Sequence, residues 1–220
     1  IYKFFEQELK MWYGDVWEEI VQIVLSDKNS QHFVNVINKA KEKYQMEVVK
    51  RESEMVDVEN WNIPESLPYG REYSEVSVKK SIMQPFFSDG KWKPETAFID
   101  FLEKSEKVEW WFKNGDRDAT FFAVRYNNGE EKPFYVDFIV KLKDGRIGLF
   151  DTKAGFTKQI AGPKIDGLYK YIQNENKKGK NLFGGIVTNT ERNYRGRWVY
   201  FDKTSKELKN DFSNWKDLEL

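Results

Sequence analysis

Apolar side chains recur at the spacing of an α-helix twice within the first fifty residues. The first stripe runs from Phe4 to Val24 and is interrupted at Gly14-Asp15, a plausible break or kink. The second runs from Phe33 to Tyr44 and follows residues 26–30, which include Ser, Asp and Asn side chains of the kind that cap helix N-termini. The pattern predicts an N-terminal helical extension, and an aromatic stripe of this kind is typical of packing rather than of a ligand site.

The pattern weakens between residues 52 and 90, where prolines interrupt it and only Val76 and Val78 alternate. This stretch still carries many aromatic side chains, which are too apolar for a free linker. We therefore expect an extended connector that packs along a domain. The expected division of the chain is a helical extension with connector at 1–90 and a second domain at 91–220.

A helix is predicted to begin at Pro94, because proline in the first turn loses no hydrogen bond there. Glu95, Phe98, Ile99 and Leu102 lie on one stripe of this helix. An acidic residue in the first turn interacts favourably with the helix dipole. The alternative is that Glu95 points over the sheet and contributes to a site.

Three strands are predicted at Thr120–Tyr126, Phe134–Leu142 and Ile147–Lys153, separated by turns that contain glycine. We expect them to form an antiparallel meander. A helix should follow Pro163, and the apolar run Leu182–Thr188 should form a buried strand, parallel to an earlier one through a right-handed crossover. The predicted fold class is α/β.

Two of these strands contain the residues of a candidate active site. Side chains alternate along a strand, so Asp151 and Lys153 project to the same side and can share one site with Asp137 of the neighbouring strand. Two carboxylates can bind Mg²⁺ together with water and phosphate oxygens, and the lysine can position a water. The pattern favours phosphodiester hydrolysis; the alternative is that Asp151 and Lys153 form an ion pair at the surface.

The composition excludes several kinds of binding site. The chain has 36 basic and 36 acidic residues, so its net charge gives no general attraction for nucleic acid, which would have to bind at local clusters such as 177–180 or Arg192, Arg195 and Arg197. Such clusters are also common as solvated faces.

There is no cysteine, which excludes disulfides and thiolate zinc sites, and the one histidine excludes a histidine-rich metal site. The absence of cysteine makes a reducing interior the simplest compartment, so a cytoplasmic location is expected, and no run is apolar enough to cross a bilayer. The start at Ile1 suggests an excised piece of a larger protein.

The order of elements resembles the core of the PD-(D/E)xK nuclease superfamily, and most closely the C-terminal endonuclease domain of type III restriction enzyme Res subunits. The resemblance covers about the last 130 residues. It is carried by Glu95-Thr-Ala-Phe98, Val108-Glu-Trp-Trp-Phe-Lys-Asn114, Phe121-Phe-Ala-Val-Arg-Tyr126, Tyr135-Val-Asp-Phe138 and Asp151-Thr-Lys153. It implies a restriction-endonuclease-like core of helix, three-strand meander, helix and further strand.

The resemblance also implies roles. Asp137 and Asp151 would bind Mg²⁺, Lys153 would orient or deprotonate the attacking water, and Glu95 would assist. Val136 stands where the motif has proline, and Asp151 where the subgroup usually has glutamate; neither change removes a ligand.

On the following helix, Lys164 and Tyr169 are candidates for phosphate contacts, although a helix-opening lysine and a packed tyrosine explain them equally well. The implied partners are double-stranded DNA, an ATP-driven helicase motor outside this chain, and a methylation and specificity subunit. The alternative from another class is an inactive nuclease-like module that binds nucleic acid or serves as a scaffold between domains.

Overall fold

The computed structural model describes residues 18, 21–23, 26–54, 61–116, 120–127, 131–153, 158–209 and 211–220. Contacts divide the chain into two units, Ile1–Arg51 and Glu52–Leu220. In the first unit, helix α2 (Asp27–Glu54) contains the predicted second stripe, and Val34, Val36 and Ile37 on it are exposed. Most of the predicted first helix lies outside the described residues. No helix in the described part of the chain is both long and apolar enough to span a bilayer.

The second unit is built on a six-stranded mixed sheet with the order β10-β9-β8-β7-β6-β3. Neighbouring strands are antiparallel, except that β7 and β8 are parallel. The strands are β3 (Val108–Lys113), β6 (Phe138–Leu142), β7 (Ile147–Thr152), β8 (Leu182–Asn189), β9 (Trp198–Phe201) and β10 (Lys216–Asp217). The mixed α/β class is confirmed, as is the parallel strand after the crossover.

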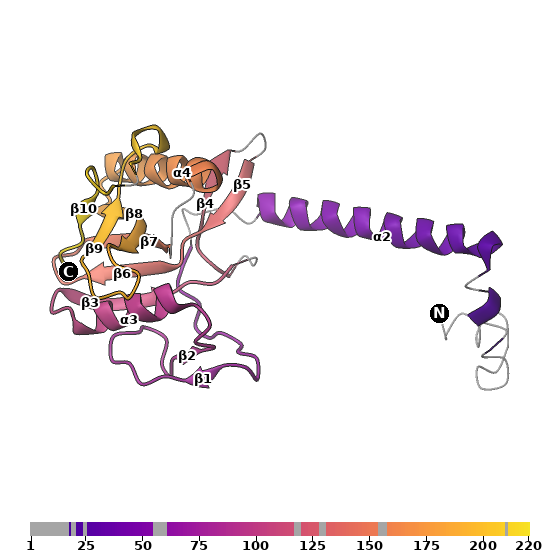
Figure 1. The fold of residues 1–220 in the computed structure, drawn as a ribbon, viewed down its shortest axis with the longest axis horizontal. Coiled ribbons are helices and arrows are strands. Elements are labelled where there is room, and N and C mark those ends of the chain that lie inside the picture. The colour runs from indigo at the N-terminus through magenta and orange to yellow at the C-terminus, as the bar shows by residue number, and fades with distance from the viewer. Residues whose placement is uncertain are drawn as a thin grey trace. The chain divides into compact units, whose positions relative to one another are not determined.

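Two helices cover opposite faces of this sheet (Figure 1). Helix α3 (Lys93–Lys104) buries Phe98 and Leu102 in a core with Phe138 and Phe150. Helix α4 (Lys158–Lys177) packs on the other face, against the alternate residues of the same strands. Residues 138 and 150 face α3, while their neighbours 139 and 149 face α4, as the alternation of a strand requires.

The predicted meander is wrong in two respects. Strand β4 (Ala123–Asn127) does not join the main sheet, because it pairs only with β5 (Glu131–Tyr135) in a separate hairpin. The predicted strand Phe134–Leu142 is divided into β5 and β6 by Val136 and Asp137. The third antiparallel strand is β3, which pairs with β6 at the edge of the sheet.

Helix α4 begins at Lys158, six residues before the predicted start, so Pro163 lies inside it. The apolar stripe that reveals this helix begins only at Ile165, which is buried, and this explains the late prediction. A 3-10 helix, η3 (Ser205–Glu207), is tied to α4 by two hydrogen bonds from Ser205 to the Asp166 carboxylate.

The expected connector lies within the second unit and packs along helix α3 and strand β3. It forms a small hairpin of β1 (Ser74–Glu75) and β2 (Phe87–Ser88), and then follows the edge of β3, where the Trp111 amide donates to Lys80 O. Glu103 of α3 accepts hydrogen bonds from the backbone amides of Lys79 and Lys80 and from the Trp111 indole. These contacts hold residues 61–92 beside α3 and β3.

Candidate active site between α3, β3 and β7

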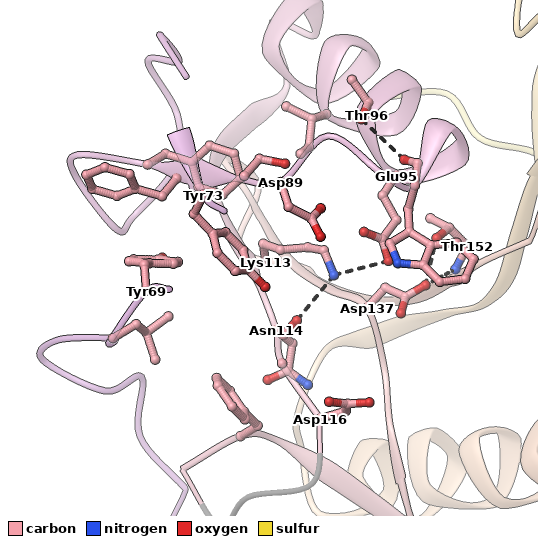
Figure 2. A pocket seen from close by; sticks show the side chains of 18 of the residues that line it. Tyr69, Tyr73, Asp89, Glu95, Thr96, Lys113, Asn114, Asp116, Asp137 and Thr152 are labelled. Carbon is pink, nitrogen blue, oxygen red and sulfur yellow. Dashed lines mark hydrogen bonds and ion pairs between the residues drawn. The ribbon is translucent and has the colours of Figure 1, made fainter. Parts of the chain in front are cut away.

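A cleft of about 500 Å³ lies where the connector, helix α3 and the ends of β3 and β7 meet. Its lining includes Glu95, Lys113, Asp137, Thr152 and Lys153. Figure 2 shows Lys113 reaching between Glu95 and Asn114, with Asp137 beside Thr152. Three of the four predicted catalytic side chains therefore line one cleft.

Asp137 is held at the point where the chain passes from the β4–β5 hairpin into the main sheet. Its Oδ2 atom accepts hydrogen bonds from the Thr152 amide at 2.7 Å and from the Thr152 hydroxyl at 2.6 Å. Its backbone carbonyl accepts from the Asn114 amide at 2.9 Å. Among the described residues, no hydrogen bond or ion pair reaches Oδ1. One oxygen is thus fixed by the protein and the other can meet a ligand.

Asp151 is buried, with 3% of the residue exposed, and is not among the residues that line the cleft. Lys153 Nζ lies 2.7 Å from its Oδ2, and apart from this ion pair no hydrogen bond from the described residues reaches that oxygen. The alternative of an exposed surface pair is therefore wrong. The two side chains do project to the same side, as strand alternation predicts.

Burial, together with the charge of Asp137, raises the pKa of Asp151 from 3.8 to about 7 against the opposing effect of Lys153. Burial lowers the pKa of Lys153, but the carboxylates of Asp151, Asp137 and Glu95 outweigh burial and raise that pKa above its ordinary value. Lys153 is therefore an ammonium at neutral pH. It can orient a water or stabilise negative charge, and it is unsuited to act as a general base.

Glu95 lies in the first turn of α3 and forms an ion pair with Lys113, whose Nζ is 3.2 Å from Oε1. Burial raises the pKa of Glu95; Lys113 lowers it, and the charge of Asp137 raises it. The influence of Asp137 places both carboxylates in one electrostatic environment. The position of Glu95 fits both expectations, since it is near the helix N-terminus and also faces the cleft.

Lys113 and Asn114 lie at the end of β3, and neither is exposed. Asn114 is buried, and its side chain joins Phe122 N, Phe122 O and Val136 O at 2.8 to 3.0 Å. Lys113 lies in the cleft, with Nζ 5.3 Å from the centre of the Phe138 ring. The only signal in the sequence is that this pair directly ends an apolar run.

The remaining predicted residues lie outside the cleft. Lys164 stacks over the Phe134 ring at 5.1 Å, and its charge lowers the pKa of Asp151. Tyr169 is half-buried on α4. Arg192 and Arg195 are exposed, and Arg197 is held by Asp217 at 2.7 Å.

Asp137 and Asp151 could hold a magnesium ion only together with water and substrate oxygens. The described residues contain no group of three or more acidic or histidine side chains assembled as a metal cage. Mg²⁺ in nucleotide and nucleic-acid enzymes is commonly held by one or two carboxylates, with water and substrate phosphate completing the shell. Asp137, with a free Oδ1, and Asp151, whose ionisation is opposed by Asp137, are groups that a cation would stabilise.

Comparisons with models of protein families, with curated proteins and with solved structures found no match to this chain.

Proposed function

We propose that this chain is a Mg²⁺-dependent nuclease domain that hydrolyses DNA phosphodiester bonds. One observation carries the proposal: Glu95, Asp137 and Lys153 line a single cleft, and Lys153 is paired there with the buried Asp151. A buried carboxylate of raised pKa beside a second carboxylate is costly to the fold, and such arrangements concentrate at functional sites.

The roles follow from the charges of the groups. Asp137 and Asp151 would hold the ion, with Glu95 as a further acid at the mouth of the cleft. A bound Mg²⁺ would supply neutralisation of charge on the phosphate and on the leaving oxygen. Lys153, as an ammonium, orients the attacking water. Thr152 fixes the Asp137 carboxylate through two hydrogen bonds, so that the acid does not have to be ordered when the substrate binds.

The finer assignment follows from the resemblance described above. A cleavage module of a type III restriction enzyme or of a related helicase-fused nuclease would carry this site on a restriction-endonuclease-like core. Its partners would be an ATP-driven motor in the same polypeptide and a methylation and specificity subunit. The sheet with β7 and β8 parallel and helices on both faces supports such a core.

The proposal is tested by nicking of supercoiled plasmid with Mg²⁺ or with EDTA. We expect nicking with Mg²⁺ only, and a loss of roughly a hundredfold or more in Asp137→Asn and Lys153→Met. The matched control is Asp202→Asn, because Asp202 also pairs with a lysine, Lys216, but lies outside the cleft. Equal nicking by the control and by the site variants would contradict the proposal and favour the inactive scaffold.

A further inference from the structure

The exposed aromatic side chains of the second unit gather at the cleft. Among the residues whose burial is described, only three aromatic side chains are exposed: Tyr69 at 36%, Tyr73 at 37% and Trp92 at 67%. All three line the cleft that holds Asp137 and Lys153. Scattered exposed aromatics would be ordinary, but their confinement to one cleft indicates a binding surface.

Ring contacts position the two tyrosines, and hydrogen bonds fix the backbone of Trp92. Tyr69 lies 5.0 Å from the Phe87 ring and 5.4 Å from the Tyr73 ring, between centroids. Trp92 is the residue before α3, and its carbonyl accepts the Thr96 amide at 3.1 Å and the Thr96 hydroxyl at 3.2 Å. Figure 2 shows Tyr69 and Tyr73 on one side of the cleft and Glu95, Asp137 and Thr152 on the other. Tyr69 and Tyr73 therefore form a wall that faces the acidic groups.

Acidic residues outnumber basic ones in the cleft, so its charge does not favour binding of a polyanion. Four acidic residues line it, Asp89, Glu95, Asp116 and Asp137, against the two lysines Lys113 and Lys153. Phosphate attraction is the main source of duplex binding, so this lining is poorly suited to a duplex backbone. Stacking of bases on aromatic rings requires no such attraction, and it is open to any base that is unpaired.

The size of the cleft leads to the same conclusion. A volume of about 500 Å³ is that of a site for a small molecule, large enough for a nucleotide or two and too small for a double helix. A base that has left its partner can enter a cleft of this size together with its phosphodiester.

We infer that the cleft accepts an unpaired DNA strand, whose bases stack on Trp92, Tyr69 and Tyr73 while the phosphodiester lies at Glu95, Asp137 and Lys153. This inference rests on the proposed nuclease function and adds the state of the substrate. Duplex DNA, the partner implied by the resemblance, would be cut only where its strands have separated.

The test measures binding by fluorescence anisotropy in EDTA, so that no cleavage occurs. Three labelled probes of equal length are compared: an oligothymidylate, the same backbone without bases, and a duplex. We expect the oligothymidylate to bind more tightly than the other two. Trp92→Ala should raise its Kd about tenfold, while Trp92→Phe should restore most of the affinity.

The base-free probe separates stacking from a general loss of binding, because Trp92→Ala should leave its Kd unchanged. Ile82→Ala is the matched control, since Ile82 is also an exposed apolar residue, 41% exposed, but does not line the cleft. Tyr73→Ala provides a second variant among the aromatic residues that line the cleft. Equal Kd values for Trp92→Ala and the unchanged chain, or an equal loss with the base-free probe, would overturn the inference.

The outcomes for the two proposals are distinguishable. Nicking that depends on Asp137, together with tighter binding of duplex than of single strand, would refute this inference and leave the nuclease proposal standing. Binding that depends on Trp92 and on bases, without any nicking that depends on Asp137, would support the single-strand site and refute the nuclease proposal.

Discussion

Replacing Asp151 with asparagine should remove a specific dependence of stability on pH. The pKa of this carboxyl rises from its ordinary 3.8 to about 7 on folding, chiefly because it is buried. At about 1.4 kcal/mol per pKa unit, the difference corresponds to at most about 4 kcal/mol. The folded chain binds the proton more tightly than the unfolded chain, so the free energy of unfolding decreases as pH rises. This contribution is fully present below 3.8 and is lost as the pH rises towards about 7.

Urea denaturation of the unchanged chain and of Asp151→Asn, from about pH 4 to about pH 8, isolates this effect, because the other titrating groups are shared. The stability of the unchanged chain should fall relative to the variant, by up to about 4 kcal/mol across that range. Asp144→Asn is the control of opposite sign: a hydrogen bond from the Arg146 amide lowers the pKa of Asp144, so its contribution is lost as pH falls. A difference between Asp151→Asn and the unchanged chain that stays constant with pH would refute the burial of an ionisable carboxyl at this position.

Three further changes test the framework that supports the cleft. Asn114→Ala should lower the free energy of unfolding by about 3 kcal/mol, because it leaves three buried backbone groups without partners; a loss below about 1 kcal/mol in urea denaturation would contradict this. Gly185→Ala should lower the free energy of unfolding by at least about 3 kcal/mol, because Gly185 has φ +146° and a Cβ there would lie 1.8 Å from Phe201 O. An unchanged melting temperature would show that β8 and β9 do not pair as described. Arg197→Ala should change stability by less than about 1 kcal/mol, because its ion pair with Asp217 is exposed, and a larger loss in the same assay would contradict that.

The elements with a clear period could be predicted from the sequence. The helix at Pro94 and the parallel strand at 182–188 were correct, because an apolar stripe or a buried run marks each of them. Strand β3 was missed because Trp111 and Phe112 are neighbours and both are buried, so that its pattern lacks the alternation of a half-buried strand. The side chain of Asn114 is hydrogen-bonded to Phe122 and Val136, which flank the β4–β5 hairpin, and no local pattern reveals such contacts between distant residues.

The candidate site could be predicted in part. Strand alternation placed Asp151 and Lys153 on one side, and their ion pair agrees with this. The part contributed by the connector could not be predicted, because Tyr69 and Tyr73 reach the cleft only when residues 61–92 dock on α3 and β3. Lys113 was missed for the same reason, since its role depends on Glu95 being opposite it in space.

Calorimetric titration with Mg²⁺ tests the central claim most directly, because it requires neither a partner protein nor a DNA substrate. The account predicts binding to the unchanged chain that is lost in both Asp137→Ala and Asp151→Ala and retained in Asp202→Asn, whose carboxylate lies outside the cleft. Mg²⁺ binding that persists in both Asp137→Ala and Asp151→Ala, or that is lost equally in Asp202→Asn, would contradict a metal site formed by Asp137 and Asp151.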